Sequence, residues 1–123
     1  MSTVKPNVFN PNCDSRQVLA LIADRWSMLI IYALGRRVRR HGELKRMIGG
    51  VSQKMLTATL RALERDGIVR RRAHDVQPPK VDYSLTPLGR TLMQPLGAIC
   101  RWAERELPKV RAARASPTGT GGV

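Results

Sequence analysis

Apolar residues recur at helical spacing in three segments that lead up to residue 48. The first predicts a helix from about Asp14 to Asp24. The second, WSMLIIYAL at 26–34, is the most apolar part of the chain, which favours the central core helix. The third predicts a short helix over Gly42–Ile48. The basic run Arg36–Arg40 before it is interpreted as a basic connector, with a solvated turn as the alternative.

A fourth amphipathic segment follows the turn Gly49-Gly50. Ser52 is placed to cap it by accepting a backbone N–H. At about 100° per residue, one face of this helix is apolar; it gathers Leu56, Thr59, Leu60 and Leu63. Two helices joined by a short glycine-containing turn are typical of a helix-turn-helix.

The opposite face of the fourth helix mixes amide, hydroxyl and charged side chains within an arc of about 120°. These are Gln53, Lys54, Thr57, Arg61, Glu64 and Arg65. Amides, hydroxyls and cations of this kind hydrogen-bond base edges and phosphates. The candidate DNA-contacting residues of this helix are Ser52, Gln53, Lys54, Thr57 and Arg61. The alternative is an ordinary solvated helix face.

Beyond Asp66-Gly67 the apolar period changes from helical to alternating. Ile68–Ala73 predicts one strand, and VDYSL at 81–85 predicts a second, with Pro78-Pro79 in the loop between them. The candidate wing contacts to the sugar-phosphate backbone are Arg70, Arg72, His74 and Lys80. We expect Arg71 on the other strand face. The predicted fold is mainly α with a small β-hairpin wing (α+β), a winged helix-turn-helix.

A last helix is predicted from Thr86-Pro87 to about Val110, because Thr caps well and Pro suits the first helical position. Pro95 is expected to kink it. Its apolar stripe is the candidate dimer interface: Leu88, Leu92, Leu96, Ile99, Cys100, Trp102 and Ala103. A stripe this long favours a partner helix from a second subunit, so the fold is expected to be dimeric through terminal helices. Packing on the chain's own first helix is the alternative.

Length and composition then set the domain plan. The 123 residues favour one domain, 13–112, with an N-terminal arm at 1–12 and a flexible tail at 113–123. The dimerisation helix lies at about 87–110. No apolar run approaches the roughly 20 residues of a membrane span, and residues 1–15 lack the apolar core of a signal peptide. We therefore expect a cytoplasmic, bacterial protein with no membrane association.

The formal net charge of +13 points to a polyanionic partner. Nucleic acid is the first candidate and an anionic membrane surface the second; a self-repelling surface without a specific partner explains the total equally well. Double-stranded DNA fits the predicted helix and wing. Few aromatic residues are available for base stacking, which argues against single-stranded RNA.

The two cysteines, Cys13 and Cys100, are too few for a disulfide framework. Cys13 falls at a predicted helix N-terminus, where the helix dipole and Arg16 would lower the thiol pKa and Asp14 would oppose them. The alternative is a buried, inert thiol. Cys100 is expected to pack, although one hypothesis pairs it with Cys13 of a second subunit after oxidation. Metal-ligand spacing and nucleotide-binding motifs are missing, so we predict no enzyme, no metal and no cofactor.

Motifs along most of the chain resemble one known family. The recognition-helix motif is matched by Val51-Ser52, Lys54, Leu56-Thr57, Leu60-Arg61, Leu63-Glu64 and Asp66-Gly67. The wing motif is matched by Pro78-Pro79, Val81-Asp82-Tyr83 and Leu85-Thr86, and single positions by Cys13, Trp26 and Trp102. Over about Cys13 to Glu106 the chain resembles the HxlR-type branch of the MarR-like winged-helix transcription regulators.

This resemblance has departures and implications. Asp14, His41 and His74 stand where the family usually has Pro, Phe and Tyr. The resemblance implies a homodimeric DNA-binding regulator, and some members respond to electrophiles or oxidants through the N-terminal Cys. We therefore expect a homodimeric repressor on a near-palindromic operator, with Cys13 as a candidate redox sensor. The alternative is a sequence-tolerant basic nucleic-acid-binding protein, architectural or RNA-directed.

Overall fold

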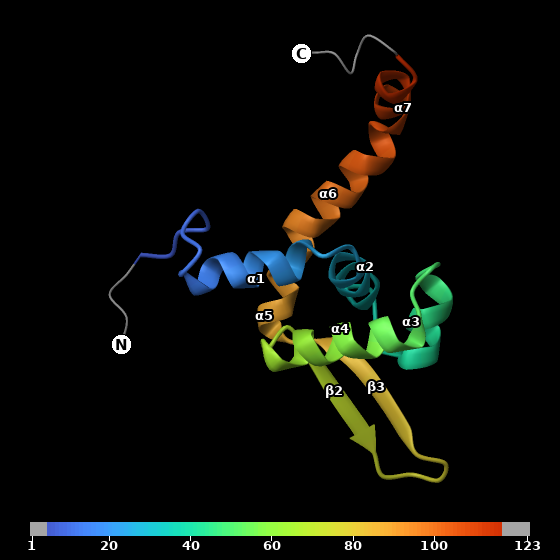
Figure 1. Cartoon of the computed structure of the whole chain (residues 1–123). Helices are drawn as coiled ribbons and strands as arrows, with labels where there is room; N and C mark the ends of the chain where they lie inside the picture. Colours follow the sequence, from blue (N-terminus) through green and yellow to red (C-terminus); the bar gives the residue numbers. More distant parts are fainter. Residues whose placement is uncertain (1–4, 117–123) are drawn as a thin grey trace. The chain divides into compact units, whose positions relative to one another are not determined.

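The computed structural model describes residues 5–116 of the chain (Figure 1). These residues divide into two compact units, with the boundary between Met93 and Gln94. The first unit contains α1 (Asp14–Ala23), α2 (Arg25–Leu34), β1 (Arg39–Arg40), α3 (His41–Met47), α4 (Gln53–Arg65), β2 (Val69–His74), β3 (Lys80–Leu85) and α5 (Pro87–Arg90). The helices α6 (Met93–Arg105) and α7 (Leu107–Ala115) follow, α6 beginning at the last residue of the first unit. The mainly helical fold with a small β-sheet is the one predicted.

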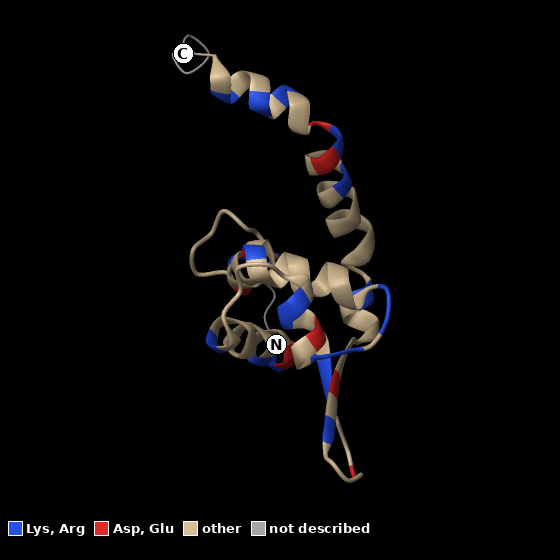
Figure 2. Ribbon diagram, turned by 90° about the vertical axis from the view of Figure 1, so that its right-hand side faces the viewer, with Lys and Arg blue, Asp and Glu red and all other residues tan. Residues whose placement is uncertain are grey.

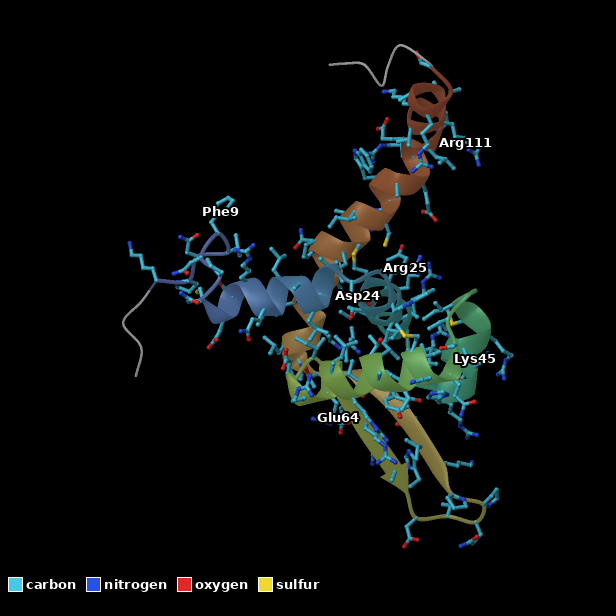
Figure 3. The ribbon with its side chains drawn as sticks, in the orientation of Figure 1. Phe9, Asp24, Arg25, Lys45, Glu64 and Arg111 are labelled. Atoms are coloured by element: carbon cyan, nitrogen blue, oxygen red, sulfur yellow. The ribbon has the colours of Figure 1, made fainter. Side chains whose placement is uncertain are left out.

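The core of the first unit is built on α2, as its apolar composition predicted. Ile30, Ile31 and Leu34 of this helix are fully buried. Its N-terminus is fixed by Asp24, whose Oδ2 accepts backbone N–H groups from Trp26 at 3.0 Å and Ser27 at 3.2 Å (Figure 3). This cap ends α1 and starts α2 within two residues, so the two helices pack against each other directly.

The predicted helix-turn-helix is confirmed as α3 and α4. The apolar face of α4 is buried, with Leu56, Thr59, Leu60 and Leu63 all below one tenth exposed. Ser52 Oγ accepts the Met55 backbone N–H at 3.0 Å, which is the predicted cap. Gly50 takes a φ of 88° in the turn, a conformation that a residue with a side chain rarely adopts.

The sheet has three antiparallel strands in the order β1-β3-β2, one more than predicted. The interpretation of Arg36–Arg40 as a connector was wrong for its last two residues, because Arg39 and Arg40 pair with Tyr83 and Asp82 of β3. Arg39 is buried, and its Nε donates to the Ala33 carbonyl oxygen at 3.0 Å. A two-residue strand whose buried side chain is an arginine leaves no alternating apolar pattern to detect.

The single long helix predicted over about 87–110 was wrong, because the segment forms α5, α6 and α7. Thr86 caps α5 by accepting the Gly89 N–H at 3.0 Å, as predicted. The helix then ends and a new one begins at Met93. Pro95 lies in the first turn of α6, where a missing N–H costs no helical hydrogen bond. Pro108 similarly lies at the start of α7. Of the expected tail, residues 113–115 are helical and 117–123 lie outside the described residues.

In the described part of the chain, no single helix is long and apolar enough to cross a membrane. Only α1 and α2 taken together reach the necessary length and composition, and the two helices are bent by 74° relative to each other.

Candidate nucleic-acid interface

The face of α4 that points away from the core carries the predicted DNA-contacting residues. Gln53, Lys54 and Arg61 are exposed, and Thr57 is half-buried. Ser52 is also exposed, but its hydroxyl oxygen already accepts the capping hydrogen bond. Ser52 is therefore placed to hold the start of α4 in shape, whereas the other four residues present donors and acceptors to the surroundings.

Thr57 has a partner that its sequence position did not reveal. His41 Nε2, from the first residue of α3, lies 3.0 Å from Thr57 Oγ1. The two residues are 16 apart in the sequence, and the part-buried contact joins the two helices of the helix-turn-helix. Only the three-dimensional packing of α3 on α4 brings the imidazole to the hydroxyl.

The hairpin register sorts the wing side chains onto two faces, because cross-strand partners point to the same side of a sheet. The pairs Arg70–Ser84, Arg72–Asp82 and His74–Lys80 share one face, together with Arg40 of β1 opposite Asp82. We call these seven residues the outer face of the wing. All four predicted wing residues lie on it, and Figure 2 shows the basic segments along the hairpin.

Asp82 is the one carboxylate on the outer face of the wing, and it is paired. His74 Nε2 lies 2.6 Å from Asp82 Oδ2. These two residues line a hollow of about 300 Å³ with Arg40, Val76 and Lys80. The predicted wing contact His74 is thus half-buried and bonded within the hairpin, whereas Arg70, Arg72 and Lys80 are exposed.

The inner wing face supplies a basic residue that the sequence analysis left out of the site. Arg71 and its cross-strand partner Tyr83 line a notch of about 200 Å³ with Leu60, Glu64, Thr57 and Arg61 of α4. The notch therefore joins the exposed face of α4 to the base of the wing. The alternation of a strand placed Arg71 opposite Arg70 and Arg72, but only the packing of α4 on β2 shows that this places it beside Thr57 and Arg61.

A second cluster of arginines lies at the start of α3. Arg37, Arg39, Arg40 and Arg46 line a hollow of about 550 Å³ together with Val38, Gly42, Glu43 and Asp82. The backbone N–H of Arg40 and the guanidinium of Arg37, at 3.2 and 2.6 Å, hold the pKa of Glu43 below its usual range. The run Arg36–Arg40 was the sequence signal for this cluster.

Cys13 is the N-cap residue of α1, as predicted from its position. Its Sγ lies 3.1 Å from Ser15 Oγ and 3.4 Å from the Asn7 backbone N–H, which donates to it. These hydrogen bonds, Ser15 first, lower the pKa of the thiol, and the negative charge of Asp14 opposes them. Arg16, which was expected to lower the thiol pKa as well, is not among its causes; its Nη1 donates to the Phe9 carbonyl oxygen at 3.3 Å.

The arm before Cys13 exposes two large apolar side chains, Val8 and Phe9. Phe9 is 86% exposed and points away from α1 (Figure 3).

A groove of about 580 Å³ lies within the same unit, between α1, the end of α4 and α5. It is lined by Val18, Ile22, Ile68, Leu88 and Leu92 together with Asp14, Gln17, Asp66 and Thr91.

The residues predicted for the dimer interface fall into exposed and buried groups. Leu88, Ile99, Trp102 and Ala103 are exposed, Leu92 and Cys100 are half-buried, and Leu96 is buried at 4% exposure. Leu88 and Leu92 belong to the first unit, and the other five lie on α6 in the second. Exposed apolar side chains this large are candidates for contact with a partner surface.

A capped helix with an exposed polar face, preceded by a short helix and followed by a basic hairpin, defines a winged helix-turn-helix DNA-binding protein. Comparison with protein families agrees: residues 21–111 match the model of the HxlR-like helix-turn-helix family. The chain belongs to this family and is a transcriptional regulator with a helix-turn-helix domain.

Individual relatives support the assignment over most of the chain. The HTH-type transcriptional regulator YtfH of Escherichia coli K12 is 47% identical over 108 residues, covering 88% of this chain and 86% of that protein. The structure of the ytfH regulator from Salmonella typhimurium has a TM-score of 0.85 at 44% identity, covering 91% of this chain and all of that one. The redox regulator HypR in its reduced form has a TM-score of 0.74 at 34% identity, covering 80% and 98%.

Proposed function

We propose that this protein is a homodimeric repressor that places α4 of each subunit in the DNA major groove of a near-palindromic operator. Gln53, Lys54, Thr57 and Arg61 contact base edges or nearby phosphates. Arg70, Arg72, His74 and Lys80 hold the wing against the sugar-phosphate backbone, and Ser52 fixes the start of α4. Such regulators act in the cytoplasm, where the chromosome of a bacterium lies.

One observation carries the proposal. Thr57 and Arg61 of α4 line the same notch as Arg71 of the wing. A DNA strand that lies over this notch meets hydrogen-bonding groups of the helix on one side and a guanidinium of the hairpin on the other. Base readout and phosphate contact therefore come from one continuous surface, which is what a winged helix requires.

The exposed apolar residues support a dimer. Leu88, Ile99 and Trp102 are each at least half exposed. Covering these side chains with a second subunit removes apolar surface from water, at roughly 25 cal/mol per Å². Two recognition helices then meet half-sites about 34 Å apart, one turn of DNA.

Thiol control at Cys13 belongs to the same proposal. The lowered pKa of the thiol favours the thiolate, which is the form that attacks electrophiles and peroxides. The similar structure HypR is named a redox regulator. Ser15→Ala removes the largest cause of the lowered pKa, so alkylation of Cys13 by iodoacetamide near neutral pH should slow. An unchanged rate in that variant would count against an activated thiol.

Selection from a random duplex library tests the DNA-binding part. A true operator should be bound at least about 10³ times more tightly than random duplex at physiological salt. Thr57→Ala and Arg61→Ala should relax preference at individual base pairs, whereas Arg70→Ala should weaken all sequences alike. Equal weakening of every sequence by all three variants would favour the sequence-tolerant alternative, which depends on net charge.

Dimerisation and repression have their own measurements. Sedimentation should give a dimer that Trp102→Glu dissociates, because a carboxylate would be buried in an apolar contact. Transcription in vitro from a promoter that contains the selected site should fall when the protein is added, since a bound dimer excludes the polymerase. A rise in transcription would identify an activator instead.

A further inference from the structure

His41 and Thr57 connect the two helices of the helix-turn-helix through one side-chain hydrogen bond. His41 Nε2 lies 3.0 Å from Thr57 Oγ1, and both residues are half-buried. Within residues 5–116, this imidazole is the hydrogen-bond partner of the Thr57 hydroxyl. The direction in which the hydroxyl points its proton therefore depends on His41.

The Thr57 side chain also reaches the proposed DNA-binding surface. It lines the notch that contains Arg61 and Arg71, so the same residue contacts both His41 and the space proposed for DNA. A threonine hydroxyl has one proton to donate and two lone pairs with which to accept. A partner that uses the proton or one of the lone pairs therefore limits which hydrogen bonds the hydroxyl can still form with a base.

The protonation of Nε2 determines whether the Thr57 hydroxyl is left as a hydrogen-bond donor or as an acceptor toward DNA. If Nε2 carries a proton, it donates to Thr57 Oγ1, and the Thr57 proton is free for a base acceptor, N7 or O6 of guanine or O4 of thymine. If Nε2 carries no proton, it accepts a hydrogen bond from the Thr57 hydroxyl. The Thr57 oxygen can then only accept a hydrogen bond from the amino group of adenine or cytosine. In both states the imidazole decides which base edge the hydroxyl matches.

We propose that His41 is a positioning residue for base readout: it selects the base edge that Thr57 reads without touching the DNA itself. The inference rests on the proposed function, because it requires the exposed face of α4 to lie in the major groove. It adds a residue from α3 to the determinants of specificity, which the proposed function confines to α4.

The second histidine of the chain provides a matched control. His74 is bonded to Asp82 on the outer face of the wing, which is proposed to contact the backbone rather than bases. His41→Phe and His74→Phe thus make the same chemical change at two half-buried positions. Only the first removes a partner of Thr57.

The experiment selects bound duplexes from a random library and then measures relative affinities for all four base pairs at each position of the selected site. The proteins are the full chain and its variants His41→Phe, Thr57→Val, Thr57→Ser, His74→Phe and the double variant His41→Phe/Thr57→Val. His41→Asn is added because its amide is too short to reach Thr57 yet keeps a polar side chain, should the Phe variant fail to fold. Thermal melting checks the fold of each.

The expected result is a loss of discrimination confined to one base pair. Thr57→Val and His41→Phe should each reduce discrimination there by about threefold to tenfold, the effect of one hydrogen bond. The double variant should lose no more discrimination than Thr57→Val alone, because without the Thr57 hydroxyl His41 has no group to position. Thr57→Ser keeps the hydroxyl and should keep the preference, and His74→Phe should change affinity for all sequences alike.

Other outcomes overturn the inference. If the Thr57-dependent base pair is discriminated equally well without His41, or if His41→Phe and His41→Asn weaken all sequences by the same factor, His41 has only a structural role. If wild-type protein selects no sequence at all, the proposed function fails and this inference with it. A selected site that depends on Thr57 but not on His41 refutes the inference alone.

Discussion

His74 and Asp82 are diagonal neighbours across the wing hairpin, with His74 Nε2 2.6 Å from Asp82 Oδ2. Asp82 also lies opposite Arg40 on one neighbouring strand and Arg72 on the other. The single carboxylate of the outer face of the wing therefore lies among the basic residues of that face. Its negative charge reduces the attraction of this surface for phosphate groups.

We predict that Asp82→Asn raises the affinity for duplex DNA of any sequence by about twofold to fivefold at physiological salt, because one opposing charge is removed. Fluorescence anisotropy with random duplex measures the change, which should shrink as salt screens the surface. Asp75→Asn is the matched control, since Asp75 is exposed in the loop after β2. An equal or larger increase in the control would mean that net charge, rather than position on the outer face, sets the affinity.

Gly89 is predicted to tolerate no side chain. A Cβ at this position of α5 would lie 2.2 Å from the Ile68 carbonyl oxygen, which is backbone and cannot rotate away. Gly89→Ala should lower the free energy of unfolding by at least about 2 kcal/mol, in the range of overpacked sites. Gly49→Ala is the control, because a Cβ there meets nothing within 4 Å. Denaturant unfolding compares the two, and similar losses would contradict the close approach of α5 to Ile68.

Glu43 is predicted to stabilise the fold in a pH-dependent way. Its pKa is lowered in the folded protein, first by the Arg40 N–H and then by the Arg37 guanidinium. A lowered folded-state pKa gives stability that is fully present above the ordinary value of 4.5 and is lost as the pH falls through the folded value. Glu43→Gln should therefore lower the melting temperature at about pH 7 and have little effect at about pH 3.

Glu64→Gln supplies the control for that pH series, because Glu64 is exposed on α4. It should change the melting temperature little at either pH. A Glu43→Gln effect of the same size at both pH values would show that the carboxylate charge is not what stabilises the start of α3.

The sequence predicted those parts of the site that depend on local periodicity. The apolar face of α4, its Ser52 cap and the wing hairpin each follow from a pattern in one continuous stretch of the chain. It missed what depends on packing between distant segments, such as β1 against β3 and His41 against Thr57. The prediction of one continuous last helix was wrong because the helix stops at Thr91 and Leu92, and neither residue type is a strong helix breaker.

The last prediction concerns the two cysteines, which lie in different units and are both half-buried free thiols. In a dimer, hydrogen peroxide should oxidise the Cys13 thiolate to a sulfenic acid, with loss of hydroxide. The Cys100 thiol of the second subunit then displaces water and forms a disulfide, so two thiols supply the two electrons that reduce the peroxide.

A non-reducing gel after mild peroxide treatment should show a covalent dimer that disappears with dithiothreitol. Cys13→Ser and Cys100→Ser should each prevent it, because each removes one end of the bond, and Ser15→Ala should slow it by raising the pKa of the Cys13 thiol. A covalent dimer that persists in Cys100→Ser must instead join two Cys13 residues. That result would refute the pairing of Cys13 with Cys100 while leaving the reactivity of Cys13 intact.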